Sequence, residues 1–213
     1  MPIGITRALA LLHRTFRHHP PAQRAHILGR FLSAPFLRTL DLVPAGARVL
    51  DIGAGHGLLA RLVAEERGRE VVAVEPDLRK TLLAYHHPRV RFVAGYADCI
   101  RGSFDAITIY DVLYRLDAAA RDALLQRAGS LLRRGGTLIL KELDPGAPLK
   151  AKWNRLQERI ADLLGMTLGD YGENPTRAQM AEMLDRAGFI TIQWKRVDFG
   201  YPHAHIVYTA RKP

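Results

Sequence analysis

A carboxylate followed by closely spaced glycines is the first arrangement in the sequence that could do chemistry. The stretch "VLDIGAGHGLL", at the seam of an apolar run and a helical pattern, contains Asp51, Gly53, Gly55 and Gly57. A tight turn explains one such glycine, whereas three beside an acid suit a ligand that approaches bare backbone. Leu58 stands where a dinucleotide-binding loop has Gly or Ala, and the lysine of a P-loop is missing. The motif therefore predicts a ligand that brings no pyrophosphate to this loop.

A second acid lies at the end of the next apolar run. Glu75 closes "EVVAVE", about 20 residues after the glycine motif, where a carboxylate can accept both hydroxyls of a ribose. Asp77 fits the N-cap of a following helix, so the two acids could also be only a strand end and a cap. The spacing favours ribose binding by Glu75.

The elements that must position these acids alternate between strands and helices. Such alternation predicts parallel strands joined by crossover helices, and the short "DFGYPH" connection makes the last two strands antiparallel to each other. In a doubly wound sheet of this kind the ligand lies outside the carboxyl ends of the strands. The predicted strands are RVLDI (48–52), EVVAVE (70–75), RVRFVA (89–94), FDAITIY (104–110), GTLILKEL (136–143), FITIQWKRV (189–197) and AHIVYTAR (204–211).

The N-terminal segment is strongly basic. Residues 1–40 contain six arginines and no Asp or Glu, in a chain of net charge +10. Ile5, Leu9, Leu12 and Phe16 recur at helical spacing opposite the arginines, which predicts a basic amphipathic helix. We expect a lid whose apolar face packs over the ligand pocket. Peripheral contact with a membrane and contact with RNA phosphates are the alternatives.

Length and composition limit the remaining possibilities. A chain of 213 residues suffices for one sizeable core, so we expect an N-terminal helical extension at 1–45 and a ligand-binding domain at 46–213 with an insertion at 144–175. The single cysteine, Cys99, excludes an internal disulfide and a multi-cysteine zinc site. No stretch approaches the ~20 apolar residues of a membrane span. We expect no metal and a cytoplasmic location, with membrane association as an option.

From Arg48 to its last residue the sequence resembles the class I S-adenosylmethionine-dependent methyltransferases. The stretches "VLDIGAGHG", "VAVEP", "AGYADCI", "FDAITIYDVLYRL" and "LLRRGGTLILKELD" match five motifs of that family in order. The resemblance implies a Rossmann-like fold with seven strands, the last one antiparallel. It also implies S-adenosyl-L-methionine as the cofactor and S-adenosyl-L-homocysteine as its product.

The resemblance assigns roles to the two acids and the glycine loop. Asp51 orients the amino end of the cofactor's methionine, the glycines pass beneath the cofactor, and Glu75 holds the ribose. Tyr96 stands where the family commonly has an aspartate before alanine, which moves the adenine contact to Asp98 or to the backbone of Ala97. The expected cofactor-binding residues are Asp51, Gly53, Ala54, Gly55, Gly57, Glu75, Pro76, Ala97, Asp98 and Tyr110.

The methyl acceptor is expected to be a small-molecule or lipid-like compound that accepts at a hydroxyl. "IYDVL" stands where base-methylating members have an Asn/Asp-Pro-Pro-aromatic motif, and Cys99 lies on the adenine side, away from an acceptor. We therefore expect no specific binding of nucleic acid. An RNA or protein methyltransferase that uses the basic helix, and a non-methylating enzyme on the same fold, remain alternatives. The oligomeric state is left open.

Topology places several polar side chains on the acceptor side. If the sixth strand runs parallel to the first five, its carboxyl end shares a rim with the glycine loop. Tyr114, Trp153, Tyr171 and Tyr201 are the expected acceptor contacts, and the insertion that contains Trp153 forms a roof. A base matters only if the acceptor must lose a proton, and the candidates are His203, Glu142 and Asp144. His203 has the most suitable ordinary pKa, whereas Glu142 could simply end a strand and Asp144 cap a turn.

Overall fold

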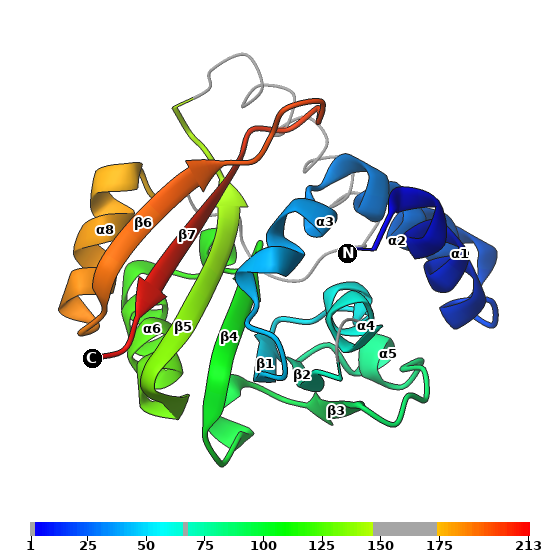
Figure 1. Cartoon of the computed structure of the whole chain (residues 1–213), viewed down its shortest axis with the longest axis horizontal. Coiled ribbons are helices and arrows are strands. Elements are labelled where there is room, and N and C mark those ends of the chain that lie inside the picture. The colour runs from blue at the N-terminus through cyan, green and yellow to red at the C-terminus, as the bar shows by residue number, and fades with distance from the viewer. Residues whose placement is uncertain (1–2, 66–67, 147–173) are drawn as a thin grey trace.

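One mixed sheet organises the computed structural model of the chain, which describes residues 3–65, 68–146 and 174–213. Its seven strands follow the order β3-β2-β1-β4-β5-β7-β6 (Figure 1). Strands β1 to β5 are parallel, and β7 runs antiparallel between β5 and β6. Strand β6 is therefore again parallel to the first five, as the acceptor-side prediction required. The predicted α/β fold with a doubly wound, mostly parallel seven-stranded sheet is confirmed.

The strands lie where the apolar runs predicted them, with one difference. Strand β5 begins at Leu132, before the predicted stretch, and pairs there with Phe104 ahead of a register shift. The strands are β1 (Arg48–Ile52), β2 (Glu70–Glu75), β3 (Val90–Ala94), β4 (Phe104–Tyr110), β5 (Leu132–Leu143), β6 (Ile190–Arg196) and β7 (His205–Arg211).

Helices cover both faces of the sheet (Figure 1), and α5 begins at the N-cap expected from the sequence. Asp77 accepts a hydrogen bond from the backbone N–H of Arg79, which confirms it as an N-cap. The helices are α1 (Ile5–Thr15), α2 (Pro21–Ser33), α3 (Phe36–Thr39), α4 (Leu58–Glu65), α5 (Leu78–Thr81), α6 (Ala118–Leu131) and α8 (Arg177–Arg186), with short 3-10 turns η1 (Leu40–Leu42), η2 (Ala97–Cys99) and η3 (Leu113–Arg115).

Alternation of side chains along the strands divides the buried apolar residues into two clusters. In β1, Val49 belongs to the cluster beneath α1, α2 and α4, whereas Leu50 and Ile52 belong to the one beneath α6 and α8. A strand covered on both faces reads as a continuous apolar run for this reason. The polar exception in β1, Asp51, is also buried and requires a separate explanation.

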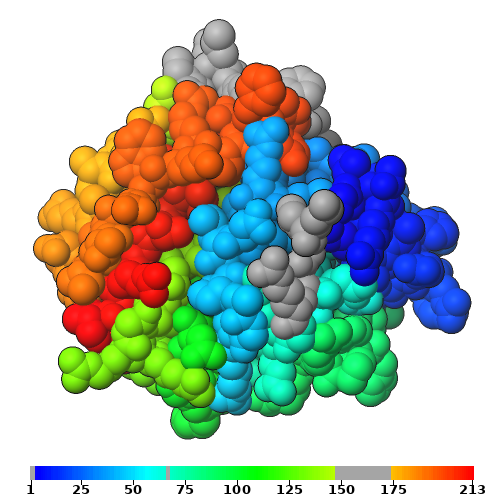
Figure 2. Space-filling model, in the orientation of Figure 1, coloured from blue at the N-terminus to red at the C-terminus, as the bar shows by residue number. Residues whose placement is uncertain are grey.

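The N-terminal helices share their core with the sheet. Leu12 and Phe16 of the predicted apolar face are buried together with Ala8, while Ile5 is 54% exposed, so the prediction is wrong at that position. The chain leading from α3 into β1, in light blue, runs between the blue N-terminal helices and the orange-red C-terminal strands (Figure 2). The apolar face of α1 is thus occupied by the protein's own core.

The described residues contain neither a membrane-spanning helix nor a cluster of metal ligands. Within them, no helix combines the length and apolar character needed to cross a membrane. The same ranges bring together no group of three or more His, Cys, Asp or Glu side chains that could hold a metal ion.

Candidate functional site

A cavity of about 790 Å³ lies at the carboxyl ends of β1, β2 and β4. The chain order makes this the switch point of the sheet, because β1 leads outward to β2 and β3 before the chain returns to β4. Helix α2 contributes His26, Ile27 and Arg30 to the wall opposite the strands. The volume falls within the range of about 300–1,000 Å³ that is typical of small-molecule sites.

Nine of the ten residues expected to bind cofactor line this cavity, and the exception is Gly57. Gly53, Gly55 and Gly57 all have positive φ angles, of 72°, 59° and 79°. A Cβ on Gly53 would lie 2.4 Å from a methyl of Val112, and one on Gly57 would lie 2.3 Å from the ring of Phe92. A Cβ on Gly55 would meet nothing within 4 Å. The outer two glycines therefore allow close packing, while Gly55 faces the open cavity.

Asp51 presents a carboxylate oxygen that the described residues leave unpaired. Its Oδ1 accepts a hydrogen bond of 2.8 Å from the Thr108 hydroxyl, whereas the buried Oδ2 has no partner among them. Burial raises the pKa of Asp51 to about 7, although the bond from Thr108 opposes this shift. Because unpaired buried polar atoms are uncommon in proteins, Oδ2 suits a cationic or hydrogen-bond-donating ligand.

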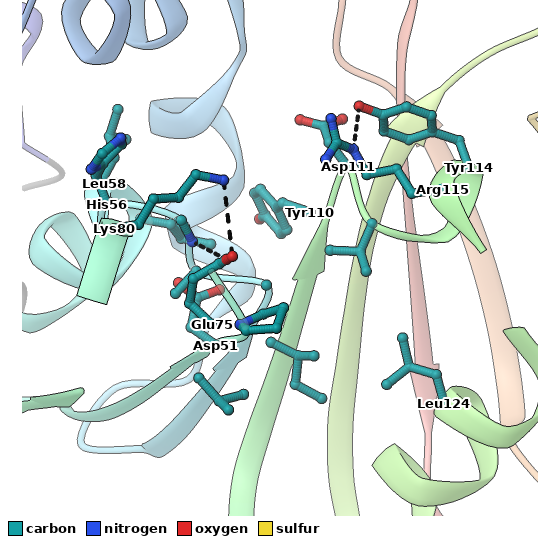
Figure 3. A pocket seen from close by; sticks show the side chains of 18 of the residues that line it. Asp51, His56, Leu58, Glu75, Lys80, Tyr110, Asp111, Tyr114, Arg115 and Leu124 are labelled. Carbon is teal, nitrogen blue, oxygen red and sulfur yellow. Dashed lines mark hydrogen bonds and ion pairs between the residues drawn. The ribbon is translucent and has the colours of Figure 1, made fainter. Parts of the chain in front are cut away.

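Glu75 braces the glycine loop. Its Oε2 accepts the backbone N–H of Gly55 at 2.8 Å, and its Oε1 accepts that of Asp77 at 3.1 Å. Lys80 Nζ lies 3.9 Å from Oε1 (Figure 3). Each carboxylate oxygen has a further lone pair, so Glu75 can hold this loop and still accept hydrogen bonds from a ligand.

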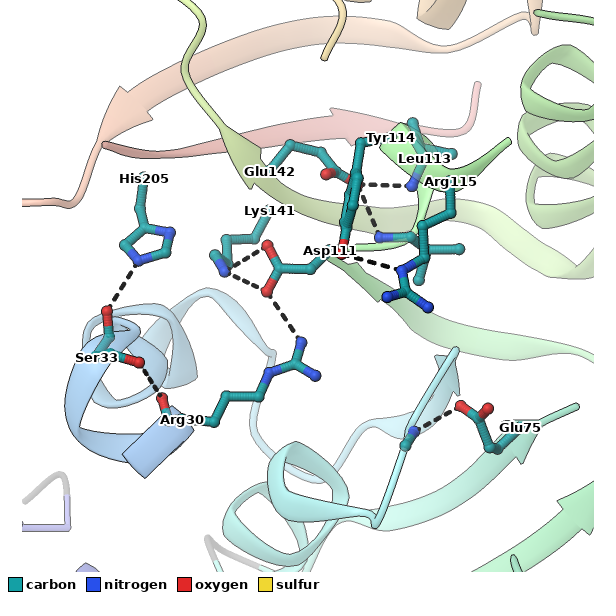
Figure 4. A network of polar contacts seen from close by, with 12 residues as sticks. Arg30, Ser33, Glu75, Asp111, Leu113, Tyr114, Arg115, Lys141, Glu142 and His205 are labelled. Carbon is teal, nitrogen blue, oxygen red and sulfur yellow. Dashed lines mark hydrogen bonds and ion pairs between the residues drawn. The ribbon is translucent and has the colours of Figure 1, made fainter. Parts of the chain in front are cut away.

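The opposite end of the cavity contains a charged cluster that the sequence analysis did not select. Asp111, just after β4, accepts hydrogen bonds at 2.7 and 2.6 Å from Lys141 Nζ and at 3.0 Å from Arg30 Nη2 (Figure 4). Burial acts to raise the pKa of Asp111, but Lys141 and Arg30 hold the pKa well below its ordinary value. Burial lowers the pKa of Lys141, and the contact with Asp111 opposes that change.

A signal for this cluster was present in the sequence. Lys141 interrupts the apolar run "GTLILKEL", and a lysine that is almost fully buried needs an anionic partner. The partner lies one strand away, because Lys141 on β5 is in register with Tyr110 on β4, next to Asp111. Asp111 has a φ of 57°, which is uncommon for a residue other than glycine.

Two of the three base candidates lie behind the cavity wall. Glu142 Oε1 accepts the backbone N–H groups of Val112 and Leu113 at 3.0 and 2.8 Å. Asp144 pairs with Arg177 at 2.5 Å. Neither carboxylate is among the described residues that line the cavity, whereas His203 is. Burial raises the pKa of Glu142 to about 8.

A second histidine beside His203 also lines the cavity and was not predicted. The His205 ring lies 5.8 Å from that of His203, and its Nε2 is 3.1 Å from the carbonyl oxygen of Ser33 on α2. Burial lowers the pKa of His205 to about 3, which leaves the ring neutral at pH 7.

The expected acceptor contacts are only partly within the described structure. Tyr114 lines the cavity beside Arg115, whose Nε donates to the Tyr114 hydroxyl at 3.0 Å. Tyr201 is not among the lining residues; its ring lies under the guanidinium of Arg38, at 5.1 Å. Trp153 and Tyr171, with most of the predicted insertion, lie outside the described residues.

Known proteins resemble this chain in sequence and in fold. The profile of a methyltransferase-domain family matches residues 24–193. The ubiquinone biosynthesis O-methyltransferase of Xanthomonas axonopodis pv. citri is 34% identical over 69% of this chain and 64% of its own length. The protein of the same name from Xanthomonas euvesicatoria pv. vesicatoria is 31% identical over 84% of this chain and 77% of its own. The chain thus spans less than two thirds of the first of these relatives.

Among solved structures, human N-acetylserotonin methyltransferase in complex with SAM aligns with a TM-score of 0.69. The alignment covers 96% of this chain and 59% of that one at 19% identity, so the likeness is one of fold. Together with the family profile, the sheet and its glycine loop define a class I S-adenosylmethionine-dependent methyltransferase. The chain belongs to the methyltransferase-domain family that matches residues 24–193.

The residues at the β1–β2 end fit this cofactor. The unpaired Oδ2 of Asp51 can accept from the amino group of its methionine, and the space beside Gly55 allows it to lie against the backbone. Glu75 retains lone pairs for two ribose hydroxyls. The cavity also extends past these residues to Asp111 and Tyr114 (Figure 3), which leaves lined space for a second molecule.

Proposed function

We propose that the chain transfers the methyl group of S-adenosylmethionine to a hydroxyl of a small-molecule or lipid-like acceptor. The observation that carries this proposal is the extension of the cavity beyond the cofactor-binding end to a second end with its own polar groups. Two relatives at 34% and 31% identity are named as O-methyltransferases of ubiquinone biosynthesis, which supports a hydroxyl as the acceptor.

The walls of the cavity support an acceptor with apolar surface. Small-molecule sites are lined mainly by apolar side chains, with a few polar groups that fix orientation. Here the apolar lining comes from α2, α3, α6, the turn before α6 and the end of β5, and includes Ile27, Phe36, Leu116, Leu124 and Leu143. An aromatic ring or a prenyl-like chain would fit such walls better than a sugar or a nucleotide would.

The bound cofactor supplies a methyl group already activated on a sulfonium, so the protein's task is mainly one of positioning. In our proposal Asp51 accepts from the amino end, Gly53 to Gly57 lie beneath the cofactor, and Glu75 binds the ribose. Pro76, Ala97, Asp98 and Tyr110 complete that end.

On the acceptor side, the three base candidates take different parts in the proposal. His203, which lines the cavity, is the remaining candidate for direct contact with the acceptor. Glu142 positions the turn after β4, and Asp144 fixes the chain after β5 through Arg177.

The first test separates cofactor binding from acceptor choice. Asp51→Ala should weaken binding of S-adenosylhomocysteine at least tenfold, because a charge-assisted hydrogen bond contributes about 1.5–3 kcal/mol. Calorimetry measures this, with Asp185→Ala on the exposed surface of α8 as the matched control. Unchanged affinity of the Asp51 variant would contradict the proposed contact between Asp51 and the cofactor's amino group.

Acceptor choice is then measured with radiolabelled cofactor and a panel of hydroxybenzenes with and without an alkyl side chain, alongside aliphatic amines. We expect transfer to hydroxyls, with the alkylated compounds preferred. Transfer to amines alone, or to none of the hydroxyl compounds, would contradict the proposed function.

A further inference from the structure

The acceptor end of the cavity contains more positive charge than its carboxylate can neutralise. Two basic side chains, Arg30 from α2 and Lys141 from β5, share the carboxylate of Asp111 (Figure 4). One carboxylate cannot fully neutralise both an ammonium and a guanidinium. Arg30 therefore keeps incompletely neutralised positive charge at the cavity wall, which favours an anionic occupant.

Arg30 is placed to meet that occupant. Its guanidinium carries five N–H donors, and among the residues that the structure describes its hydrogen-bond partner is Asp111, through Nη2. The Arg30 side chain is 41% exposed and lines the cavity, whereas that of Lys141 is 1% exposed and lies behind the wall. Arg30 can therefore contact a ligand directly, and Lys141 can act only through its field.

Within the acceptor end the neighbouring groups do not cancel this positive charge, although Glu75 at the cofactor end also attracts the guanidinium. Burial lowers the pKa of His26 and that of His205, the latter to about 3, so neither ring contributes charge near neutral pH. Burial raises the pKa of Glu142 to about 8, which keeps this carboxyl largely protonated there. The charged and titratable groups around this end are His26 and Arg30 from α2, Asp111, Tyr114 and Arg115 after β4, Lys141 and Glu142 from β5, and His203 and His205 at β7, with Asp51 and Glu75 at the cofactor end.

We propose that the guanidinium of Arg30, backed by Lys141, binds the acceptor oxygen as an oxyanion, so that the acceptors are acidic hydroxyl compounds of the phenol class. This inference rests on the proposed O-methyltransfer. Arginine stays protonated in proteins and cannot act as the base; it favours the ionised form of the acceptor instead.

Methyl transfer to an ionised acceptor needs no side-chain base. The hydroxyl proton passes to bulk water as the acceptor binds in its ionised form. A lone pair of the oxyanion then forms the new O–C bond as the bond between the methyl carbon and sulfur breaks, and its electron pair stays on sulfur. The guanidinium, held in place by Asp111, acts before this transfer: an adjacent positive charge raises the fraction of acceptor that is bound as the nucleophilic oxyanion.

The direct test uses 4-nitrophenol, whose absorbance distinguishes the ionised from the neutral form. It is titrated against pH in the complex of the full chain with S-adenosylhomocysteine. The apparent pKa of the bound phenol should fall by at least one unit relative to solution, a tenfold preference for the ionised form. Arg30→Gln should abolish this shift and Arg30→Lys should restore part of it. Arg24→Gln, on the same helix but outside the cavity lining, should leave it unchanged.

Three results would overturn the proposal: no saturable binding of 4-nitrophenol to the wild-type complex, an unshifted pKa of the bound phenol, or an Arg30→Gln variant that keeps the shift. A fourth comes from calorimetry. If Arg30→Gln weakens S-adenosylhomocysteine tenfold but leaves methylthioadenosine unaffected, the guanidinium serves the cofactor's carboxylate instead.

A separate measurement distinguishes failure of this proposal from failure of the proposed function. Turnover is compared for substituted phenols of graded acidity and for an aliphatic alcohol. Transfer to all of them at rates independent of acidity and of Arg30 would leave O-methyltransfer standing and refute the oxyanion site. Transfer to none of them would refute both.

Discussion

The two ends of the cavity are built in different ways. At the cofactor end, Asp51, the glycine loop and Glu75 come from two neighbouring strands and the turns that follow them, and Glu75 holds the backbone of both turns. At the acceptor end, Arg30 from α2, Asp111 from the turn after β4 and Lys141 from β5 meet. The first end depends on local backbone geometry and the second on long-range charge pairing, so mutations at the two ends should differ in kind.

The largest expected effect is on stability at the acceptor end. Asp111→Ala leaves the buried Lys141 without its partner, which should cost about 3–5 kcal/mol of the free energy of unfolding. Urea denaturation measures this. As a control, Asp122→Ala removes the partner of Arg186 in an exposed pair, where a far smaller loss is expected because water screens the charges.

A double variant sharpens this prediction. Asp111→Ala combined with Lys141→Met removes the unpaired buried charge as well, so it should recover much of the lost stability. Equal instability of the single and double variants would mean that the charge pair is not the cause.

The next effect separates two glycines within the cofactor end. Gly57→Ala should cost about 1–2 kcal/mol for its left-handed backbone and a further ~1–3 kcal/mol for the clash with Phe92. Gly55→Ala carries only the backbone cost, because its added methyl points into open space. Denaturation and calorimetry on both variants test the difference. Gly57→Ala should lose more stability than Gly55→Ala does. Gly55→Ala should lose more affinity for S-adenosylhomocysteine than Gly57→Ala does. The reverse order would contradict the different roles assigned to the two glycines.

The smallest expected effect is a pH dependence at Asp51. Its pKa in the folded protein is raised to about 7, so affinity for the ammonium of S-adenosylhomocysteine should fall as the pH drops below 7, by up to about tenfold per unit. Asp51→Asn should flatten this profile, and methylthioadenosine, which lacks the amino group, should show none of it. A flat wild-type profile would remove Asp51 from the amino-binding role.

The raised pKa of Asp51 has the opposite effect on the stability of the unliganded protein: a higher pH favours binding but lowers stability. Between the ordinary value near 4 and a pH near 7, folded Asp51 holds a proton that the unfolded chain has released. Because the folded state binds more protons in that window, the contribution of Asp51 to stability falls as the pH rises through it. Binding of an ammonium at Asp51 offsets that loss.

The contrast between the two ends also explains what could be predicted from sequence. The glycine loop, the acid after β2 and the alternation of strands and helices are local patterns, so the sheet and the residues around the loop could be anticipated. The partners of Asp111 are separated from it along the chain, and no spacing rule joins Arg30 to Lys141. Glu142 was selected by its place at the end of β5, but its Oε1 is occupied by the turn after β4, which only the three-dimensional register could show.

Arg30 both lines the cavity and attaches α2 to the sheet through Asp111. Any molecule that draws the guanidinium toward itself changes how firmly that helix is held, and thermodynamic linkage makes the relation reciprocal. The factor by which a bound acceptor suppresses opening of α2 should then equal the factor by which the closed helix binds the acceptor more tightly than the open one. Amide exchange along residues 21–33, measured with and without a bound phenol, would report that factor.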